Sequence, residues 1–264
     1  MSGARGGAGE AHLAASRHRA ILRMLDTHGQ VSAAGLSDEL GVTHETVRKD
    51  LVALQEQGLL KRVHGGAVRI GSVADEQLLV ARTQQAEEKA RIGVAALQFV
   101  PESGAILLDS GSTVAALAAC LPVNPRLIAV TNSLPIALAL LPKVGSVTTL
   151  GGRLRAETHA TVDDWTLQHL EAIRTDVVFL GTNALSPTHG LATPDQAESA
   201  VKAALVRAAR LRVLLADHTK VGVESVYRYA DVQDIDVLVS DAGLPAAVAA
   251  ELERDCGVEV VRAR

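Results

Sequence analysis

The chain has 264 residues, of which 48% are hydrophobic and 21% are charged, and its formal net charge is −4. This length and hydrophobic content allow two domains with substantial cores and exclude a structureless chain. Because the total charge is mildly negative, binding to nucleic acid must be inferred from the local distribution of charge. No apolar run approaches the length of a membrane span and no signal peptide is evident, so we expect a cytoplasmic protein without a membrane partner.

The N-terminal residues and the cysteines exclude two further classes. Residues 1–15 are rich in Gly and Ala, which predicts a disordered tail. Only Cys120 and Cys256 occur, with no CxxC or Cys/His spacing, so neither a disulfide framework nor a zinc site is indicated. We expect no metal, no cofactor and no catalytic residue.

Two short helices are predicted first. The segment RHRAILRMLDTHG places Ile21, Leu22 and Leu25 on one apolar stripe. The segment VSAAGLSDEL, residues 31–40, begins with Ser32 as a candidate N-cap, and Gly41 supplies the sharp turn of a helix-turn-helix.

The next stretch, VTHETVRKDLVALQEQGLLKRVHGG, carries the features of a recognition helix. Thr43 is a candidate N-cap, the apolar positions Val47, Leu51 and Leu54 share one face, and Gly58 ends the helix. The opposite face presents polar and basic side chains in the first two turns, where a recognition helix reaches base edges and phosphates. These side chains are His44, Glu45, Arg48 and Lys49.

The segment LLKRVHGGAV follows that helix and predicts a two-stranded ribbon, because short apolar runs flank a Gly-Gly pair. Its basic residues Lys61, Arg62 and His64 suit a wing along the phosphate backbone. We therefore predict a winged helix-turn-helix domain over residues 16–70. The alternative is a helical subdomain whose charges are merely solvated. The local excess of basic residues is mild, so operator binding should need a dimer whose two footprints add.

Residues 17–68 resemble the N-terminal winged helix-turn-helix of the DeoR family of bacterial transcription regulators, and the segment TVRKDLVALQEQGLLKRVHGGA carries the most specific part of that likeness. The resemblance implies sequence-specific binding to operator DNA. The candidate DNA-binding residues are Thr43, His44, Glu45, Thr46, Arg48, Lys49, Lys61, Arg62 and His64.

The chain after the wing predicts an α/β domain. Residues 71–100 should hold a linker and a connecting helix that Pro101 ends, and residues 101–264 a second domain. In that domain five short apolar runs, GAILLD, RLIAVT, SVTTL, DVVFL and RVLLA, are each followed by a polar cluster. Alternation of such runs with helices predicts a parallel sheet, and the five clusters should converge at its carboxyl edge.

The first cluster, Ser110 to Thr113, suggests an anion site, because it leads from a strand into the N-terminus of a helix. Ordinary N-capping by Ser112 or Thr113 is an equal alternative. Lys202 and Lys220 can add positive charge, while Asp109, Asn132 and Asp217 can bond sugar hydroxyls. For Lys202, a solvated helix face and pairing with Glu198 remain an alternative.

The motifs LLDSGST, VTNSLPIA, LGGRLR, FLGTNAL, HGLATPDQAESAVKAAL and LLADHTKVG resemble the sensor domain of the DeoR family. The resemblance implies a fold similar to ribose-5-phosphate isomerase and CoA-transferases, and a phosphorylated sugar as effector. The effector-binding candidates that it implies are Asp109, Ser110, Gly111, Ser112, Thr113, Asn132, Ser133, Gly151, Gly152, Gly181, Lys202, Asp217 and Lys220.

One stretch departs from the family pattern. After LGGRLR the family usually has a Gly-Pro pair, whereas this chain has Asp163-Asp164. Two carboxylates facing a phosphate site would repel the anion. The alternatives are that they point to solvent or that the effector is unusual. Trp165 beside them is expected to pack rather than to stack on a ligand.

These features favour a repressor of carbohydrate metabolism genes that acts as a homo-oligomer, a dimer or a tetramer, under control of a phosphorylated sugar. The second hypothesis is a phosphosugar isomerase with a DNA-binding appendage, in which Asp109, Glu198 or Asp217 would be the base. The third is a scaffold without a ligand, which would need every strand-end cluster to be turn chemistry alone.

Overall fold

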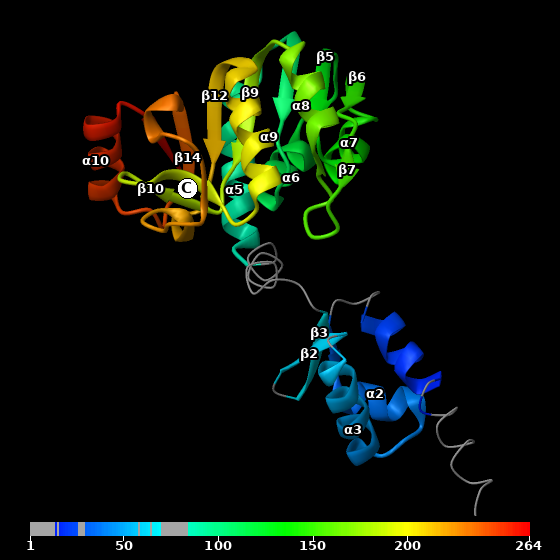
Figure 1. Cartoon of the computed structure of the whole chain (residues 1–264). Helices are drawn as coiled ribbons and strands as arrows, with labels where there is room; N and C mark the ends of the chain where they lie inside the picture. The colour runs from blue at the N-terminus through cyan, green and yellow to red at the C-terminus, as the bar shows by residue number, and fades with distance from the viewer. Residues whose placement is uncertain (1–13, 15, 26–29, 58, 64, 70–83) are drawn as a thin grey trace, which may run out of the picture. The chain divides into compact units, whose positions relative to one another are not determined.

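The computed structural model describes residues 14, 16–25, 30–57, 59–63, 65–69 and 84–264 (Figure 1). The chain divides into two units, Met1–Val73 and Ala74–Arg264, and each is described by itself. Among the described residues, no helix is both long and apolar enough to cross a membrane.

The first unit combines three helices with a small sheet. The helices are residues 16–25, α2 (Ala33–Leu40) and α3 (His44–Glu56), and the strands are β1 (Gln30–Ser32), β2 (Leu60–Val63) and β3 (Gly66–Arg69). The predicted apolar stripes meet in one core of Ile21, Leu25, Leu36, Val47, Leu51, Leu54, Leu60 and Ala67. The predicted helix-turn-helix and ribbon are therefore confirmed, while Gly58 and His64 lie outside the described residues.

Local capping fixes the turn between α2 and α3. Ser32 accepts a hydrogen bond from the backbone N–H of Gly35, and Thr43 accepts one from Thr46 at 3.2 Å. Gly41 ends α2 in the left-handed conformation, with φ of 62°. All three predicted roles are confirmed, because capping depends on neighbours a few residues away.

One strand of the wing was not predicted. Val31, expected at the start of a helix, lies in β1, which pairs antiparallel with β3 to give the strand order β1-β3-β2. A Cβ on Gly66 would lie 2.0 Å from the carbonyl oxygen of Val31. Only glycine permits this close approach, so the Gly-Gly pair shapes the attachment of the ribbon as well as its turn.

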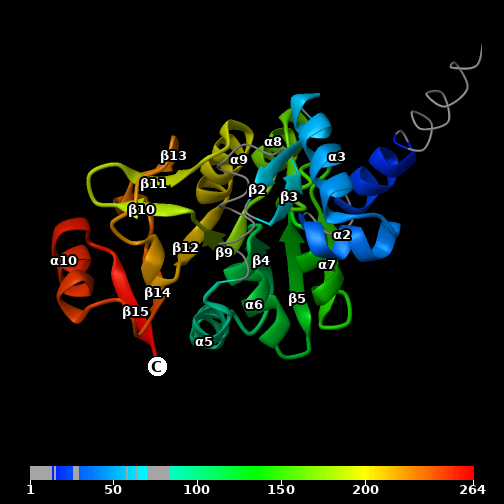
Figure 2. The same ribbon diagram turned by 90° about the horizontal axis from the view of Figure 1, so that it is seen from below.

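The second unit is built on a seven-stranded parallel sheet (Figure 2). In spatial order its strands are β15 (Glu259–Ala263), β14 (Val237–Asp241), β12 (Ala209–Leu215), β9 (Thr175–Gly181), β4 (Gly104–Leu108), β5 (Asn124–Thr131) and β6 (Val144–Thr149). The five predicted strands are confirmed, and β14 and β15 extend the sheet at one edge. The fold class is therefore α/β with an N-terminal winged helix-turn-helix.

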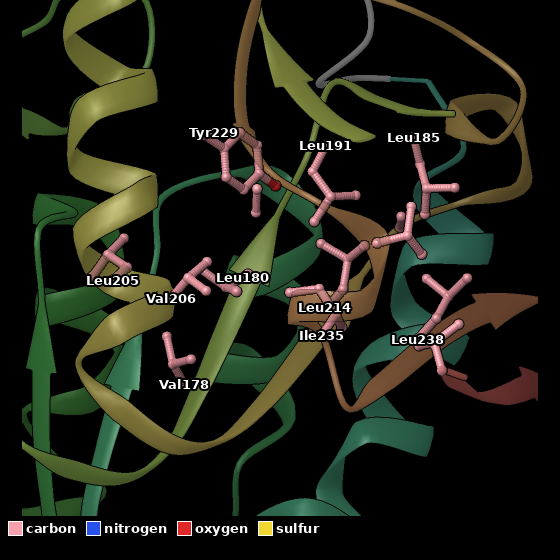
Figure 3. Packing of buried hydrophobic residues seen from close by; sticks show 14 of the residues in the cluster. Val178, Leu180, Leu185, Leu191, Leu205, Val206, Leu214, Tyr229, Ile235 and Leu238 are labelled. Carbon is pink, nitrogen blue, oxygen red and sulfur yellow. The ribbon is translucent and has the colours of Figure 1, made fainter. Parts of the chain in front are cut away.

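Helices cover both faces of this sheet, as a parallel sheet requires. On one face α5 (Ala86–Ala96), α6 (Ser112–Cys120) and α7 (Leu134–Leu140) pack on the side of Leu108 and Phe179. On the other, α8 (Asp164–Glu171), α9 (Gln196–Arg207) and α10 (Ala246–Cys256) share a core with Leu107 and Leu180. Figure 3 shows part of this second core, in which Leu205 and Val206 of α9 lie beside Val178 and Leu180 of the sheet.

Two small antiparallel sheets lie between the main elements. One pairs β7 (Arg153–Leu154) with β8 (Thr161–Val162), and the other has the order β10-β11-β13. Its strands are Ala184–Ser186, Gly190–Thr193 and Tyr227–Ala230. The remaining short elements are the 3-10 helices η1 (Leu97–Phe99), η2 (His218–Lys220) and η3 (Val232–Asp234).

Candidate DNA interface and effector cavity

The predicted recognition face of α3 points to solvent. His44, Glu45, Arg48 and Lys49 are exposed, and Thr46 is half-buried. Arg62 on β2 is exposed, and its backbone N–H donates to Oε1 of Gln55 on α3 at 2.9 Å. The wing is thus tied to the helix by a backbone bond, while the side chains of Arg48, Lys49 and Arg62 remain exposed.

Asp50, in the same motif, has a role that the sequence reasoning missed. It is buried, and its carboxylate accepts bonds from Nε of Arg17 at 2.8 Å and from a ring nitrogen of His18 at 2.9 Å. The first helix is therefore clamped to α3 through an acidic residue. The hydrogen bond with Asp50 raises the pKa of Arg17, whose charge is paired with Asp50 within the domain.

The predicted anion site lies where β4 runs into α6. Gly111 is the N-cap of α6 with φ of 126°, a conformation that favours glycine, and no hydrogen bond from a described side chain caps the helix. N-capping by Ser112 or Thr113 is therefore wrong. The first residues of α6 instead border an open pocket with about 530 Å³ of empty space, part of which is open to solvent. A helix N-terminus of this kind attracts anions through its N–H groups and its dipole.

Three lysines line this cavity, from three different elements. They are Lys89 on α5, Lys202 on α9 and Lys220 on η2. The whole lining is Lys89, Ser110, Gly111, Ser112, Thr113, Thr158, Gly181, Thr182, Asn183, Glu198, Lys202 and Lys220.

Lys202 is buried in a polar network rather than exposed on a helix face, so the solvated alternative is wrong. Its ammonium donates to Oδ2 of Asp109 and, at 3.0 Å, to the carbonyl of Gly181. Asp109 also accepts from the backbone N–H of Gly181 at 3.1 Å. Burial lowers the pKa of Lys202, but the charges of Asp109 and Glu198 outweigh burial, so the pKa lies above its ordinary value. Lys202 therefore carries a positive charge at neutral pH.

Tyr229 completes this network. Its hydroxyl donates to the carbonyl of Gly181 at 3.1 Å, and its ring centroid lies 5.7 Å from Nζ of Lys202. Burial raises the pKa of Tyr229 to about 12, so the phenol remains neutral.

Glu198 is the one carboxylate in the lining. It is buried, and Oε1 lies 2.9 Å from a guanidinium nitrogen of Arg155, while Oε2 accepts from the hydroxyl of Thr193 at 3.4 Å. Asp109 and Asp217, the other two carboxylates considered as a base, are also engaged. Asp109 holds Lys202, and Asp217 accepts from the backbone N–H of Thr219 at 3.1 Å.

Asp217 and its neighbour His218 lie at the end of β12. His218 Nδ1 lies 2.9 Å from Oδ2 of Asp241, whose Oδ1 accepts from the backbone N–H of His218. Burial raises the pKa of Asp241, but its hydrogen bonds with His218 and Gly243 outweigh burial, and the pKa falls below its ordinary value. This pair anchors the loop that carries Lys220.

Seven of the predicted effector residues line the cavity: Ser110, Gly111, Ser112, Thr113, Gly181, Lys202 and Lys220. Six do not line it: Asp109, Asn132, Ser133, Gly151, Gly152 and Asp217. The expectation that all five clusters converge is therefore wrong.

The reason is that the β7–β8 hairpin and α8 bond to the segments that follow β5 and β6. The backbone N–H of Thr161 donates to the carbonyl of Asn132, and the carbonyl of Gly151 accepts from the hydroxyl of Thr166 at 2.7 Å. Only Thr158 of the connecting loop lines the cavity.

Five lining residues were not predicted: Lys89, Thr158, Thr182, Asn183 and Glu198. Thr182 and Asn183 directly follow Gly181, so a wider window at that strand end would have included them. Lys89 lies in the polar EEKAR segment, and nothing in that segment alone distinguishes it from a solvated lysine.

Comparison with known proteins assigns both units. A profile of the DeoR-like helix-turn-helix domain matches residues 17–73, and a profile of the DeoR C terminal sensor domain matches residues 84–242. The chain belongs to the DeoR family of transcriptional regulators.

Its relatives within the DeoR family match over nearly their whole length. The HTH-type transcriptional regulator GlpR of Haloferax volcanii is 36% identical over 250 residues, which cover 94% of this chain and 98% of that protein. The HTH-type transcriptional repressor GlcR of Bacillus subtilis is 31% identical, covering 92% and 93%. The glycerol-3-phosphate regulon repressor of Escherichia coli is 30% identical, covering 88% and 92%.

Among solved structures, ribose 5 phosphate isomerase A from Neisseria gonorrhoeae aligns with 53% of this chain and 55% of its own, at 19% identity and a TM-score of 0.37. The fold class of this DeoR-family chain rests on its parallel sheet and on the family match.

The Asp163-Asp164 pair is explained by the start of α8. Asp163 is the N-cap with φ of 112°, a conformation typical of glycine, and Asp164 is the first helical residue, where proline is favoured. The Asp163 carboxylate accepts from the backbone N–H groups of Arg153, at 2.9 Å, and Trp165, at 3.0 Å. Neither aspartate lines the cavity. Trp165 is 69% exposed, so the expectation that its side chain packs is wrong.

Proposed function

We propose that this DeoR-family regulator is a repressor of carbohydrate metabolism genes, and that a phosphorylated sugar or polyol in the cavity weakens its hold on operator DNA. The single observation that carries the proposal is the cavity itself, in which the uncapped N-terminus of α6 faces the same space as Lys89, Lys202 and Lys220. Amides and ammonium groups suit a phosphate, and Thr158, Asn183 and Glu198 offer partners for hydroxyls. Two relatives support the proposal: both the glycerol-3-phosphate regulon repressor and GlcR are repressors, and the first is named for a phosphorylated polyol.

The decisive experiment is thermal unfolding of the full chain with glycerol 3-phosphate, glucose 6-phosphate, fructose 1-phosphate and their unphosphorylated parents. A ligand that binds only the folded state stabilises it by about 2.7 kcal/mol at 100 times its dissociation constant. We expect one phosphorylated compound to raise the melting temperature and its parent to have no effect. Equal shifts with both compounds, or none across the panel, would contradict a phosphate site.

For the DNA interface we propose that Arg48 reads a base and that Lys61 contacts a phosphate. An operator can be selected from a pool of randomised duplexes with the full chain. Arg48→Ala should then weaken operator binding by about 1–3 kcal/mol and leave binding to random DNA nearly unchanged. Lys61→Ala should weaken both and reduce the salt dependence. Equal losses on both DNAs for Arg48→Ala would refute base reading.

We also propose a homo-oligomer, a dimer or a tetramer, because the basic excess of one DNA-binding unit is mild and two units on one operator would add their footprints. Light scattering of the purified chain tests the mass directly, and a monomer at operator-binding concentrations would contradict it.

We propose binding without turnover in the cavity. The three carboxylates considered as an isomerase base are all held by other groups, Glu198 by Arg155 and Asp109 by Lys202 among them. An isomerase assay of the full chain with ribose 5-phosphate tests this.

A further inference from the structure

Lys89 joins the cavity to the helix that opens the second unit. It lies in the first turns of α5, is only 4% exposed, and lines the cavity together with Ser110–Thr113. Its Nζ donates to the backbone carbonyl of Gln84 at 2.6 Å. One ammonium group therefore reaches both the effector cavity and the backbone that precedes α5.

The body of α5 packs in the core of the second unit, whereas its first turn begins at a residue in the left-handed conformation. Ile92 and Ala96 are fully buried, and a Cβ on Gly93 would come within 2.8 Å of the backbone of α6, so the two helices pack backbone to backbone. At the N-terminus Gln85 has φ of 57° and gives no side-chain cap. The bond from Lys89 to Gln84 is thus one of the contacts that set the position of the first turn.

The other two lysines of the cavity are placed differently. Lys202 is held by Asp109 within the sheet region, and Lys220 lies on η2, between β12 and β13. Neither belongs to the part of the chain that leads to the DNA-binding unit. Gln84 and Lys89, by contrast, lie in the N-terminal part of the second unit, which follows the DNA-binding unit in the chain.

We infer that Lys89 is a ligand of the effector's anionic group and the residue through which occupancy of the cavity is transmitted to the start of α5. This inference rests on the proposed function, since it needs an anionic effector in that cavity. An ammonium bonds a phosphate oxygen more strongly than a neutral carbonyl, so a bound phosphate competes with Gln84 for Lys89. The effector then binds two positions of the α5 start with different affinity, which is what coupling between sites requires.

Two matched variants of the full chain test this inference, Lys89→Met and Lys220→Met. Each removes one cation from the same cavity, but only Lys89 touches the α5 start. The probe is whichever of glycerol 3-phosphate, glucose 6-phosphate and fructose 1-phosphate stabilises the wild-type chain. Calorimetry measures its affinity, and operator binding is measured with and without the probe at saturation.

Both variants should bind the probe about tenfold or more weakly, as expected for one lost charge-assisted contact. Saturating probe should change the operator affinity of the wild type and of Lys220→Met by a similar factor, within the roughly 5- to 150-fold range of allosteric coupling. For Lys89→Met the factor should fall below about twofold. An unchanged factor for Lys89→Met at saturation overturns the inference while leaving the proposed function intact.

Hydrogen exchange of the wild-type chain gives a second test that needs no variant. Adding the probe should change exchange at the amides of residues 84–89. Exchange that changes at residues 110–113 but not at 84–89 overturns the transmission through Lys89. If the probe changes neither region and binds nowhere, the proposed function fails, and that outcome is distinct from the other two.

Discussion

Replacing Lys202 by methionine should destabilise the second unit strongly, because it leaves the carboxylate of Asp109 buried without its cation. Lys202→Met keeps the length of the side chain and removes two hydrogen bonds, to Asp109 and to the carbonyl of Gly181. Asp109 is 1% exposed, so water cannot replace the lost ammonium without rearrangement.

The size of the effect follows from what remains bonded. Gly181 keeps the hydroxyl of Tyr229 on its carbonyl, and Asp109 keeps the backbone N–H groups of Gly181 and Ser110. The loss should therefore lie near the lower end of the usual range for breaking a buried ion pair, at about 3 kcal/mol. For a domain of this size that corresponds to about 6–12 °C in melting temperature.

The assay is a double-mutant cycle with Asp109→Asn, measured by calorimetric unfolding of the full chain. Once residue 109 is neutral, Lys202→Met should lower the free energy of unfolding much less than it does in the wild type, since no buried carboxylate is left unpaired. If Lys202→Met lowers the free energy of unfolding equally in both backgrounds, the lysine acts through packing and the electrostatic reasoning is refuted.

Three further predictions concern backbone geometry and titration. Gly66→Ala should destabilise the DNA-binding unit by at least about 3 kcal/mol, because its Cβ would lie 2.0 Å from a strand carbonyl. Gly65→Ala should destabilise it by only about 1–2 kcal/mol, because of the positive φ at that position. Circular dichroism melts compare the two variants, and equal melting temperatures would contradict this prediction. Asp163→Ala should lower the free energy of unfolding by about 1–2 kcal/mol, because α8 loses its cap. Asp163→Gly should lower it less, since glycine adopts φ of 112° freely. A larger loss of stability for the glycine variant in thermal unfolding would show that backbone strain is unimportant here. The pKa of Tyr229 is about 12 in the folded chain and about 10 when unfolded, so its contribution to stability is full below pH 10 and declines between pH 10 and 12. Denaturant titrations over this window should therefore show a smaller decline in the free energy of unfolding for Tyr229→Phe than for the wild type. Identical declines would refute the assignment.

The elements that could be predicted are those whose causes lie within a few residues. The caps Ser32 and Thr43, the stripe from Val47 to Leu54 and the cluster after β4 all follow from local spacing, and the structure has each of them. Parallel strands buried on both faces can also be predicted from local sequence, because they are uninterrupted apolar runs.

What could not be predicted depends on pairs far apart in the chain. Arg17 and Asp50 are 33 residues apart, and Asp109 and Lys202 are 93 apart, so no window of sequence contains either pair. Strand β1 is only three residues long and exists because β3 lies beside it. The sequence around Lys89 is typical of a solvated lysine, and only the packing of α5 against α6 brings Lys89 to the cavity.

The Asp163-Asp164 pair shows how a departure from the family pattern can mislead when it is judged by charge alone. Two adjacent carboxylates suggest repulsion of a phosphate, but one caps α8 and holds the backbone of Arg153, and neither lines the cavity. A glycine at this position would meet the same φ without strain, and an aspartate meets it by adding hydrogen bonds that offset the strain. The departure is therefore compensated within the turn that contains it, and the positive groups of the cavity lie elsewhere, at the N-terminus of α6 and on the lysines around it.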